Sequence, residues 1–166
     1  MSDRVPEAPA LHPDIAALGL LVGTWAGEGT GEYPTTKPFA YGEELRFDHI
    51  GKPFLRYAQR TWSTDDGRPL HSESGYVRFH PPSAVELVVA HPIGVVEVAE
   101  GDIEGGKLVL HSTMIGRTST AKEVTAITRQ ITVEGAAFSY ELEMAAVGQP
   151  LVQHLKATLH RVSREA

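Results

Sequence analysis

The chain has 166 residues, of which 15 are lysine or arginine and 21 are aspartate or glutamate, so its formal net charge is −6. It contains no cysteine, which excludes disulfides, zinc ribbons, iron–sulfur clusters and thiol nucleophiles. The acidic balance also argues against a nucleic-acid partner, which requires a concentrated positive surface. Eight histidines therefore become the chief side chains that could hold a metal or the iron of a cofactor.

The N-terminal region predicts an arm followed by a short helical turn. Residues 1–12 include Pro6 and Pro9, and we expect a flexible arm there. Pro13 begins the predicted helical turn and Gly19 ends it. The first residues lack the apolar core of a secretory signal, and no stretch reaches the roughly 20 apolar residues of a membrane helix. We therefore expect a cytoplasmic protein with no membrane partner.

Ten short segments with strand character follow, separated by glycine, proline and Asp-Gly turn signals at intervals of roughly 8–12 residues. The connections are too short for crossover helices, so neighbouring strands are expected to be antiparallel. The sequence thus predicts an all-β fold, a ten-stranded antiparallel up-and-down β-barrel with a short N-terminal helical turn, forming one domain over residues 13–166. Ten strands leave a wider lumen than side chains fill, which favours a ligand cavity. The predicted strands are 23–32, 39–50, 54–64, 71–80, 84–91, 95–100, 107–114, 123–133, 138–147 and 152–162.

Two histidines are predicted at the same end of one hairpin. His71 and Phe79 share a face of their strand, and Val85 and His91 share a face of the next. If the two prolines between the strands close a hairpin, the numbers of paired residues sum to about 162, by the strict antiparallel register. Phe79 then lies near Val85, and His71 lies beside His91 at the open end of an apolar face. The alternative is that both imidazoles are half-solvated at the barrel rim.

The last strand leaves the orientation of His154 open. Alternation places His154 and His160 on one face, and Leu155 and Leu159 on the other. The leucine face has the character of a packed face, which would direct His154 outward. Ligand-binding lumens are often mixed in polarity, however, so alternation does not decide which face is internal.

Other polar patterns carry no chemistry that we can assign. The glycine-rich residues 27–31 do not lead into a helix, so they do not predict a phosphate cradle. We expect Glu43, Glu44, Glu86 and Glu97 to lie on solvated strand faces.

A series of ordered blocks resembles the nitrobindin family. Residues 23–29 fit the GxWxGxG pattern near the N-terminus of that family, and the resemblance extends from about Leu18 to Val162. The other matching blocks are Tyr33-Pro34-Thr35, Gly51-Lys52-Pro53-Phe54, His71-Ser72-Glu73-Ser74-Gly75-Tyr76, Gly94-Val95-Val96-Glu97, Ala121-Lys122-Glu123 and Gln153-His154-Leu155.

The resemblance implies a barrel similar to those of lipocalins and fatty-acid-binding proteins, with one haem b held at one mouth. It implies that His154 faces the haem as the axial iron ligand and catalytic residue, with His71 and His91 lining the distal side. Thr35 and Lys122 are expected to contact the edge or the propionates of the cofactor. The implied activity is the isomerisation of peroxynitrite to nitrate at a ferric haem, together with binding of nitric oxide. A homodimer is also compatible with the resemblance.

Two alternatives stay open at this point. The same barrel could be a non-catalytic carrier of an apolar ligand such as a fatty acid. It could also hold a metal ion between His71, His91 and His154 without any haem.

Overall fold

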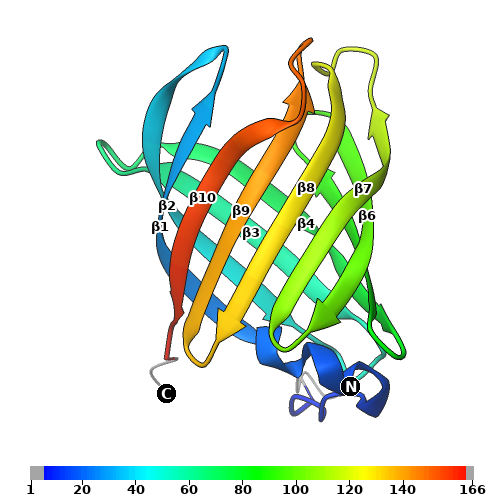
Figure 1. Cartoon of the computed structure of the whole chain (residues 1–166). Coiled ribbons are helices and arrows are strands. Elements are labelled where there is room, and N and C mark those ends of the chain that lie inside the picture. Colours follow the sequence, from blue (N-terminus) through cyan, green and yellow to red (C-terminus); the bar gives the residue numbers. More distant parts are fainter. Residues whose placement is uncertain (1–5, 164–166) are drawn as a thin grey trace, which may run out of the picture.

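The strands of the computed structural model, which describes residues 6–163, close into a barrel (Figure 1). Each strand is antiparallel to its neighbours, and β1 pairs with both β2 and β10. This arrangement confirms the predicted ten-stranded antiparallel barrel. The elements are η1 (Pro13–Leu21), β1 (Gly23–Tyr33), β2 (Thr36–Asp48), β3 (Leu55–Ser63), β4 (Pro69–His80), β5 (Ala84–His91), β6 (Val95–Glu104), β7 (Lys107–Arg117), β8 (Val124–Glu134), β9 (Ala137–Ala146) and β10 (Val152–Arg161).

One end of the barrel is covered by η1 (lower end of Figure 1). Ile15 and Leu18 of this 3₁₀ helix are fully buried. The indole of Trp25 is also buried; its Nε1–H donates to the carbonyl of Leu21 at 2.9 Å, and its ring packs against Phe138. Apolar burial at this end anchors η1 to the strands and leaves the opposite end open.

The lower half of the lumen is packed with side chains. The cavity that remains there has a volume of about 40 Å³. This volume holds a few water molecules but not a long acyl chain. Its walls are mainly aliphatic and aromatic and include Leu45, Phe47, Val77, Leu87, Leu108, Leu110 and Phe138.

The N-terminal segment reaches the closed end of the barrel. Of the predicted arm at 1–12, residues 1–5 lie outside the described residues. Pro9 lies against Gly51 of the β2–β3 connection, and Leu11 packs against the core. Within residues 6–163, no helix has the length and hydropathy required to cross a membrane.

The predicted end of the sixth strand at Gly101 is wrong. Gly101 lies inside β6, paired with Val85 on one side and Leu110 on the other. A Cβ at this position would lie 1.7 Å from the carbonyl oxygen of Val109. The glycine therefore allows two backbones to approach closely, and the turn comes later, at Gly105–Gly106.

Candidate functional site

The open end of the barrel contains a cavity of about 590 Å³. This volume lies in the range of about 300–1,000 Å³ that is usual for cofactor and ligand pockets. The cavity predicted from the strand count is therefore present. Much of its wall is apolar, formed by Phe39, Ile93, Val95, Val124, Ile127, Leu142, Met144 and Leu155. The imidazoles of His71, His91 and His154 are also part of the lining.

A β-bulge directs His154 into this cavity. Gln153 pairs with Glu143 of β9, but Leu155 pairs with Leu142, so His154 is the extra residue between the two pairs. Consequently His154 and Leu155 both line the cavity although they are adjacent in sequence. In a regular strand, only one of these two neighbouring side chains could face the lumen. The bulge allows both to do so.

The His154 imidazole is held by the backbone of a neighbouring strand. Its Nδ1 lies 3.0 Å from the carbonyl oxygen of Glu32, and a carbonyl can only accept, so Nδ1 carries the hydrogen. Nε2 is then left with its lone pair. Burial lowers the pKa of His154, although the hydrogen bond to Glu32 opposes the shift. The neutral imidazole that results is the form that binds metals.

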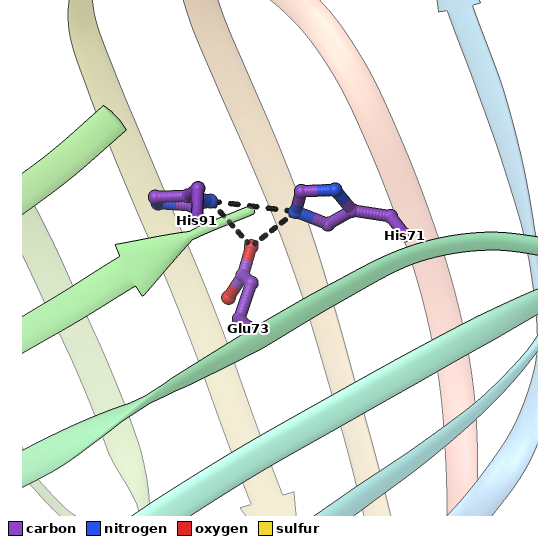
Figure 2. Close-up of side chains that lie close together, drawn as sticks. All are labelled: His71, Glu73 and His91. Atoms are coloured by element: carbon purple, nitrogen blue, oxygen red, sulfur yellow. Dashed lines mark hydrogen bonds and ion pairs between the residues drawn. The ribbon is translucent and has the colours of Figure 1, made fainter. Parts of the chain in front are cut away.

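A second group of side chains, His71, Glu73 and His91, converges on the cavity from β4 and β5 (Figure 2). Nε2 of His71 lies 3.3 Å from Nδ1 of His91. Oε1 of Glu73 lies 3.6 Å from Nε2 of His71 and 3.5 Å from Nδ1 of His91. His154 lies outside this trio, although it lines the same cavity. Sequence reasoning predicted the two neighbouring histidines but missed the carboxylate between them.

The register of the β4–β5 hairpin explains why Glu73 was missed. Phe79 pairs with Val85 as predicted, but the paired numbers sum to 164 because the loop is centred on Pro82. The pairing of Ser74 with Ala90 therefore places Glu73, not His71, level with His91. The predicted sum of 162 was therefore wrong by two. An even shift of this kind leaves each side chain on its predicted face of the strand but changes the residue that it pairs with on the next strand.

A buried ionic layer lies behind this cluster. Nε2 of His91 lies 3.1 Å from Oε2 of Glu97. The Arg129 guanidinium donates to Glu97 at 2.7 Å and to Glu73 at 3.3 Å. The Tyr57 hydroxyl donates to Glu73 at 2.9 Å. Two carboxylates thus share one guanidinium, and each is fixed by several donors.

These contacts keep both carboxyl groups ionised. Burial by itself would raise the pKa of Glu73, but the positive charge of Arg129 and the hydrogen bond from His71 hold it well below its usual value. The pKa of Glu97 is also lowered, because Arg129 and His91 outweigh the effect of burial. An ionised Glu97 can only accept, so Nε2 of His91 carries a hydrogen and Nδ1 presents a lone pair toward the cluster.

A separate carboxyl group, that of Glu43, lines the small inner cavity of about 40 Å³. Glu43 accepts from Nε2 of Gln59 at 2.9 Å and from the Tyr140 hydroxyl at 2.7 Å. The Tyr140 oxygen lies 2.8 Å from that of Tyr41. Burial raises the pKa of Glu43 to about 7, although both hydrogen bonds oppose the shift. Glu43 is thus a buried group that exchanges a proton near neutral pH.

The prediction that Glu43 and Glu97 are solvated was wrong. Glu43 is 1% exposed and Glu97 is 0% exposed. Each has one partner on a neighbouring strand, His91 for Glu97 and Gln59 for Glu43, and another on a strand that is not a neighbour, Arg129 for Glu97 and Tyr140 for Glu43. The second contact depends on closure of the barrel, so the local pattern does not reveal the burial. The other two carboxylates do lie on the outer face, where exposed arginines pair with them: Glu44 with Arg60, and Glu86 with Arg78.

The remaining predicted contacts lie on loops at the open end. Thr35 is exposed in the β1–β2 turn, and Lys122 is exposed in the β7–β8 connection. Within residues 6–163, neither belongs to the cavity lining, and their roles stay predictions. Lys37 and Arg68 do line the cavity and place cationic side chains there. Sequence reasoning missed both: Lys37 lies at the start of β2, before the predicted strand 39–50 begins, and Arg68 lies in the β3–β4 connection.

The fold and this cavity define the protein as a ligand-binding β-barrel with imidazoles presented at one mouth. Residues 14–161 match the family described as the THAP4-like, heme-binding beta-barrel domain, and the chain belongs to this haem-binding family of nitrobindins. The family resemblance predicted from the sequence is confirmed.

Named relatives cover almost the whole chain. A protein of Mycobacterium avium named peroxynitrite isomerase 2 is 53% identical, over 91% of this chain and 96% of its own. A protein of Nocardia farcinica named peroxynitrite isomerase is 54% identical, over 92% of this chain and 93% of its own. The crystal structure of Rv2717c from M. tuberculosis superposes with a TM-score of 0.87 at 49% identity, covering 93% of this chain and 100% of that one.

Proposed function

We propose that this chain, acting as one domain over residues 13–166, binds one haem b through His154 and isomerises peroxynitrite to nitrate. The observation that carries the proposal is the orientation of His154. Its Nδ1 is engaged by the Glu32 carbonyl at 3.0 Å, so Nε2 is free to ligate iron inside the cavity. The relatives named peroxynitrite isomerase, about half identical to this chain, support the reaction.

The residues of the cavity suit a haem. An apolar wall matches the porphyrin ring, and a neutral imidazole is a common axial ligand of haem iron. Lys37 and Arg68 supply positive charge that complements the propionate groups. We retain Thr35 and Lys122 as proposed contacts at the exposed edge of the cofactor.

When bound, the ferric haem supplies a Lewis acid with an open position for an anionic substrate. The side chains of this protein then have distinct tasks. His154 orients the cofactor, and its ring is fixed by Glu32. His71 and His91 line the same cavity, so their imidazoles are within reach of a small molecule that enters it. The apolar part of the wall provides contacts for the porphyrin ring, and nitric oxide is proposed to bind in the same cavity.

The test is stopped-flow decay of peroxynitrite by the haem-loaded protein, with the nitrate yield measured. We expect faster decay and a higher nitrate yield than with free haem at equal concentration. His154→Ala should abolish the Soret spectrum of the bound haem and reduce decay to the free-haem rate. His160→Ala is the matched control, because His160 lies exposed on the same strand. Equal rates for protein and free haem would reduce the protein to a haem carrier.

A fatty-acid carrier is less favoured by the packing of the lumen. The cavity of about 40 Å³ in the lower half leaves no channel for an acyl chain. An apolar ligand would have to fit within the open end, where His154 and the charged cluster would be left beside it.

A further inference from the structure

We propose that His71, Glu73 and His91 form a binding site for a divalent transition metal of the zinc class, distinct from the iron ligand His154. The inference stands on the geometry of the three side chains and does not require the proposed function. All three residues belong to the β4–β5 hairpin, and His154, the proposed haem ligand, is not among them.

The three donor atoms are spaced like one face of a tetrahedron. They are Nε2 of His71, Nδ1 of His91 and Oε1 of Glu73, and their separations are 3.3, 3.5 and 3.6 Å (Figure 2). Ligands at the usual zinc distances of about 2.0–2.2 Å in tetrahedral geometry lie about 3.3–3.6 Å from one another. A zinc ion thus fits between the donors with little movement of the chain.

Each donor is held in place by further contacts of the kind that metal ligands use. Nε2 of His91 faces Glu97 at 3.1 Å, which is the carboxylate–histidine arrangement that orients zinc ligands. Oε2 of Glu73 accepts from Tyr57 at 2.9 Å and from Arg129 at 3.3 Å. Oε1 faces the two histidines and accepts only a longer contact, at 3.5 Å, from Nη2 of Arg129.

The backbone of His71 is also fixed. Its N–H donates to Oγ1 of Thr61 at 3.0 Å, and that hydroxyl lies 3.3 Å from the His71 carbonyl oxygen. The start of β4 is therefore tied to β3 at the level of the cluster. Such preorganisation lowers the cost of assembling the ligands around an ion.

The charge of the cluster favours a cation. Glu73 and Glu97 contribute two negative charges, and Arg129 contributes one positive charge to both of them. One negative charge remains in a region where Glu73, Glu97 and His91 are all buried. Buried charge without a partner is unfavourable, and a divalent ion at the donor triangle would compensate it.

The composition of the site selects the class of ion. Two imidazoles and one carboxylate suit zinc or cobalt better than magnesium or calcium, which prefer oxygen ligands. Three protein donors leave the fourth position to a water molecule, as in the open class of zinc sites. All three residues line the cavity, so this position is reachable from the mouth of the barrel.

The experiment is titration of the full-length, haem-free chain with Zn²⁺ by calorimetry and with Co²⁺ by visible absorption. We expect one equivalent of metal and the intense visible bands of tetrahedral cobalt. His71→Gln should weaken binding at least a hundredfold. Glu97→Gln changes a residue that contacts the ligand His91 but would not itself bind the metal, so it should weaken metal binding about 10–100-fold. His154→Ala and the exposed His80→Ala should change the affinity less than twofold.

Because His71 is half-buried at the cavity wall, His71→Gln keeps the test valid even if variants of the buried His91 fail to fold. The proposal is overturned if Zn²⁺ and Co²⁺ do not bind, or if His71→Gln binds them like the parent chain. Loss of binding in His154→Ala equal to that in His71→Gln would assign the ion to the haem ligand instead. Haem binding is measured separately from the Soret spectrum. Failure of the metal-site proposal therefore does not affect the proposal for haem, and failure of the haem proposal does not affect the metal site.

Discussion

The phenol ring of Tyr33 packs edge-on against the imidazole of His154, with ring centroids 5.2 Å apart. The Tyr33 hydroxyl accepts from the N–H of Ala146 at 2.8 Å and lies 3.1 Å from the carbonyl oxygen of the same residue. One side chain thus connects β1 to the end of β9 and also supports the ring that we propose as the iron ligand. Orientation of His154 depends on this contact as well as on Glu32.

Tyr33→Phe separates these two tasks. The variant keeps the ring beside His154 but leaves the buried N–H of Ala146 without its partner, which costs about 1–3 kcal/mol. We expect urea denaturation to show that loss while the haem-loaded protein keeps its Soret spectrum. Tyr33→Leu removes the ring as well and should release haem faster than Tyr33→Phe. Equal haem release from both variants would contradict a supporting role for the ring.

Glu43 should make stability fall as the pH rises. Its pKa is about 7 in the folded chain against an ordinary value of 4.5, so the folded state holds a proton that the unfolded state has lost between these values. Stability is therefore expected to drop across this window, by up to about 3 kcal/mol for this group. Glu43→Gln removes the titration.

The measurement compares the free energy of unfolding of Glu43→Gln and the parent chain at pH 5 and pH 8. We expect the variant to gain about 2–3 kcal/mol relative to the parent between the two pH values. Comparing the two chains at each pH cancels the titration of the histidines. An identical difference at both values would show that Glu43 titrates normally.

Glu73 and Glu97 should act in the opposite direction at lower pH. Their pKa values are lowered in the folded chain, so their contribution is present above the ordinary value of 4.5 and is lost as the pH falls below it. Their common partner is Arg129, and Arg129→Met would remove the positive charge that both buried carboxylates share, leaving only the contacts from Tyr57 and His91. Breaking a buried ion pair in this way costs about 3–5 kcal/mol.

Chemical denaturation at pH 7 tests that cost. Arg60→Met is the matched control, because Arg60 pairs with Glu44 on the outer surface and such exposed pairs contribute about 0–1 kcal/mol. A loss in Arg129→Met no larger than in Arg60→Met would mean that solvent reaches the buried carboxylates.

Much of the fold could be predicted because the turns are recognisable from short stretches of the sequence. Glycine, proline and Asp-Gly signals separate ten segments, and closure of the barrel follows from the need to satisfy ten strands without an open edge. The end of the sixth strand was wrongly predicted at Gly101, because glycine is typical both of turns and of places where two backbones approach closely. The sequence does not say which of the two applies until the neighbouring strands are known.

The site was predictable only in part, for a related reason. The two histidines of the β4–β5 hairpin are close in sequence, so their proximity follows from one turn. Arg129 lies 56 residues from Glu73 and 32 from Glu97, and its pairing with them depends on the whole barrel. The bulge at His154 likewise breaks the alternation on which strand predictions rest.

Two glycines provide a test of the close approach in β6. Gly101→Ala places a Cβ against the Val109 carbonyl, and we expect a loss of about 1–3 kcal/mol from the backbone shift that this forces. Gly116→Ala is the control, because its Cβ would have no neighbour nearer than 3.9 Å. Thermal unfolding should separate the two variants clearly. Similar melting temperatures would mean that β6 and β7 can move apart at little cost.

The plug formed by η1 and Trp25 has a kinetic consequence. A barrel sealed at one end is approached from the other, so whatever enters the cavity passes Lys37 and Arg68 on arrival and again on departure. A bulky, uncharged substitution at the rim, at a position other than Lys37 and Arg68 that does not touch the bound molecule, should slow both passages by the same factor and leave equilibrium occupancy unchanged. Substitutions deeper in the lumen should instead alter occupancy. The association and dissociation rates of the bound molecule therefore distinguish residues of the rim from residues deeper in the lumen.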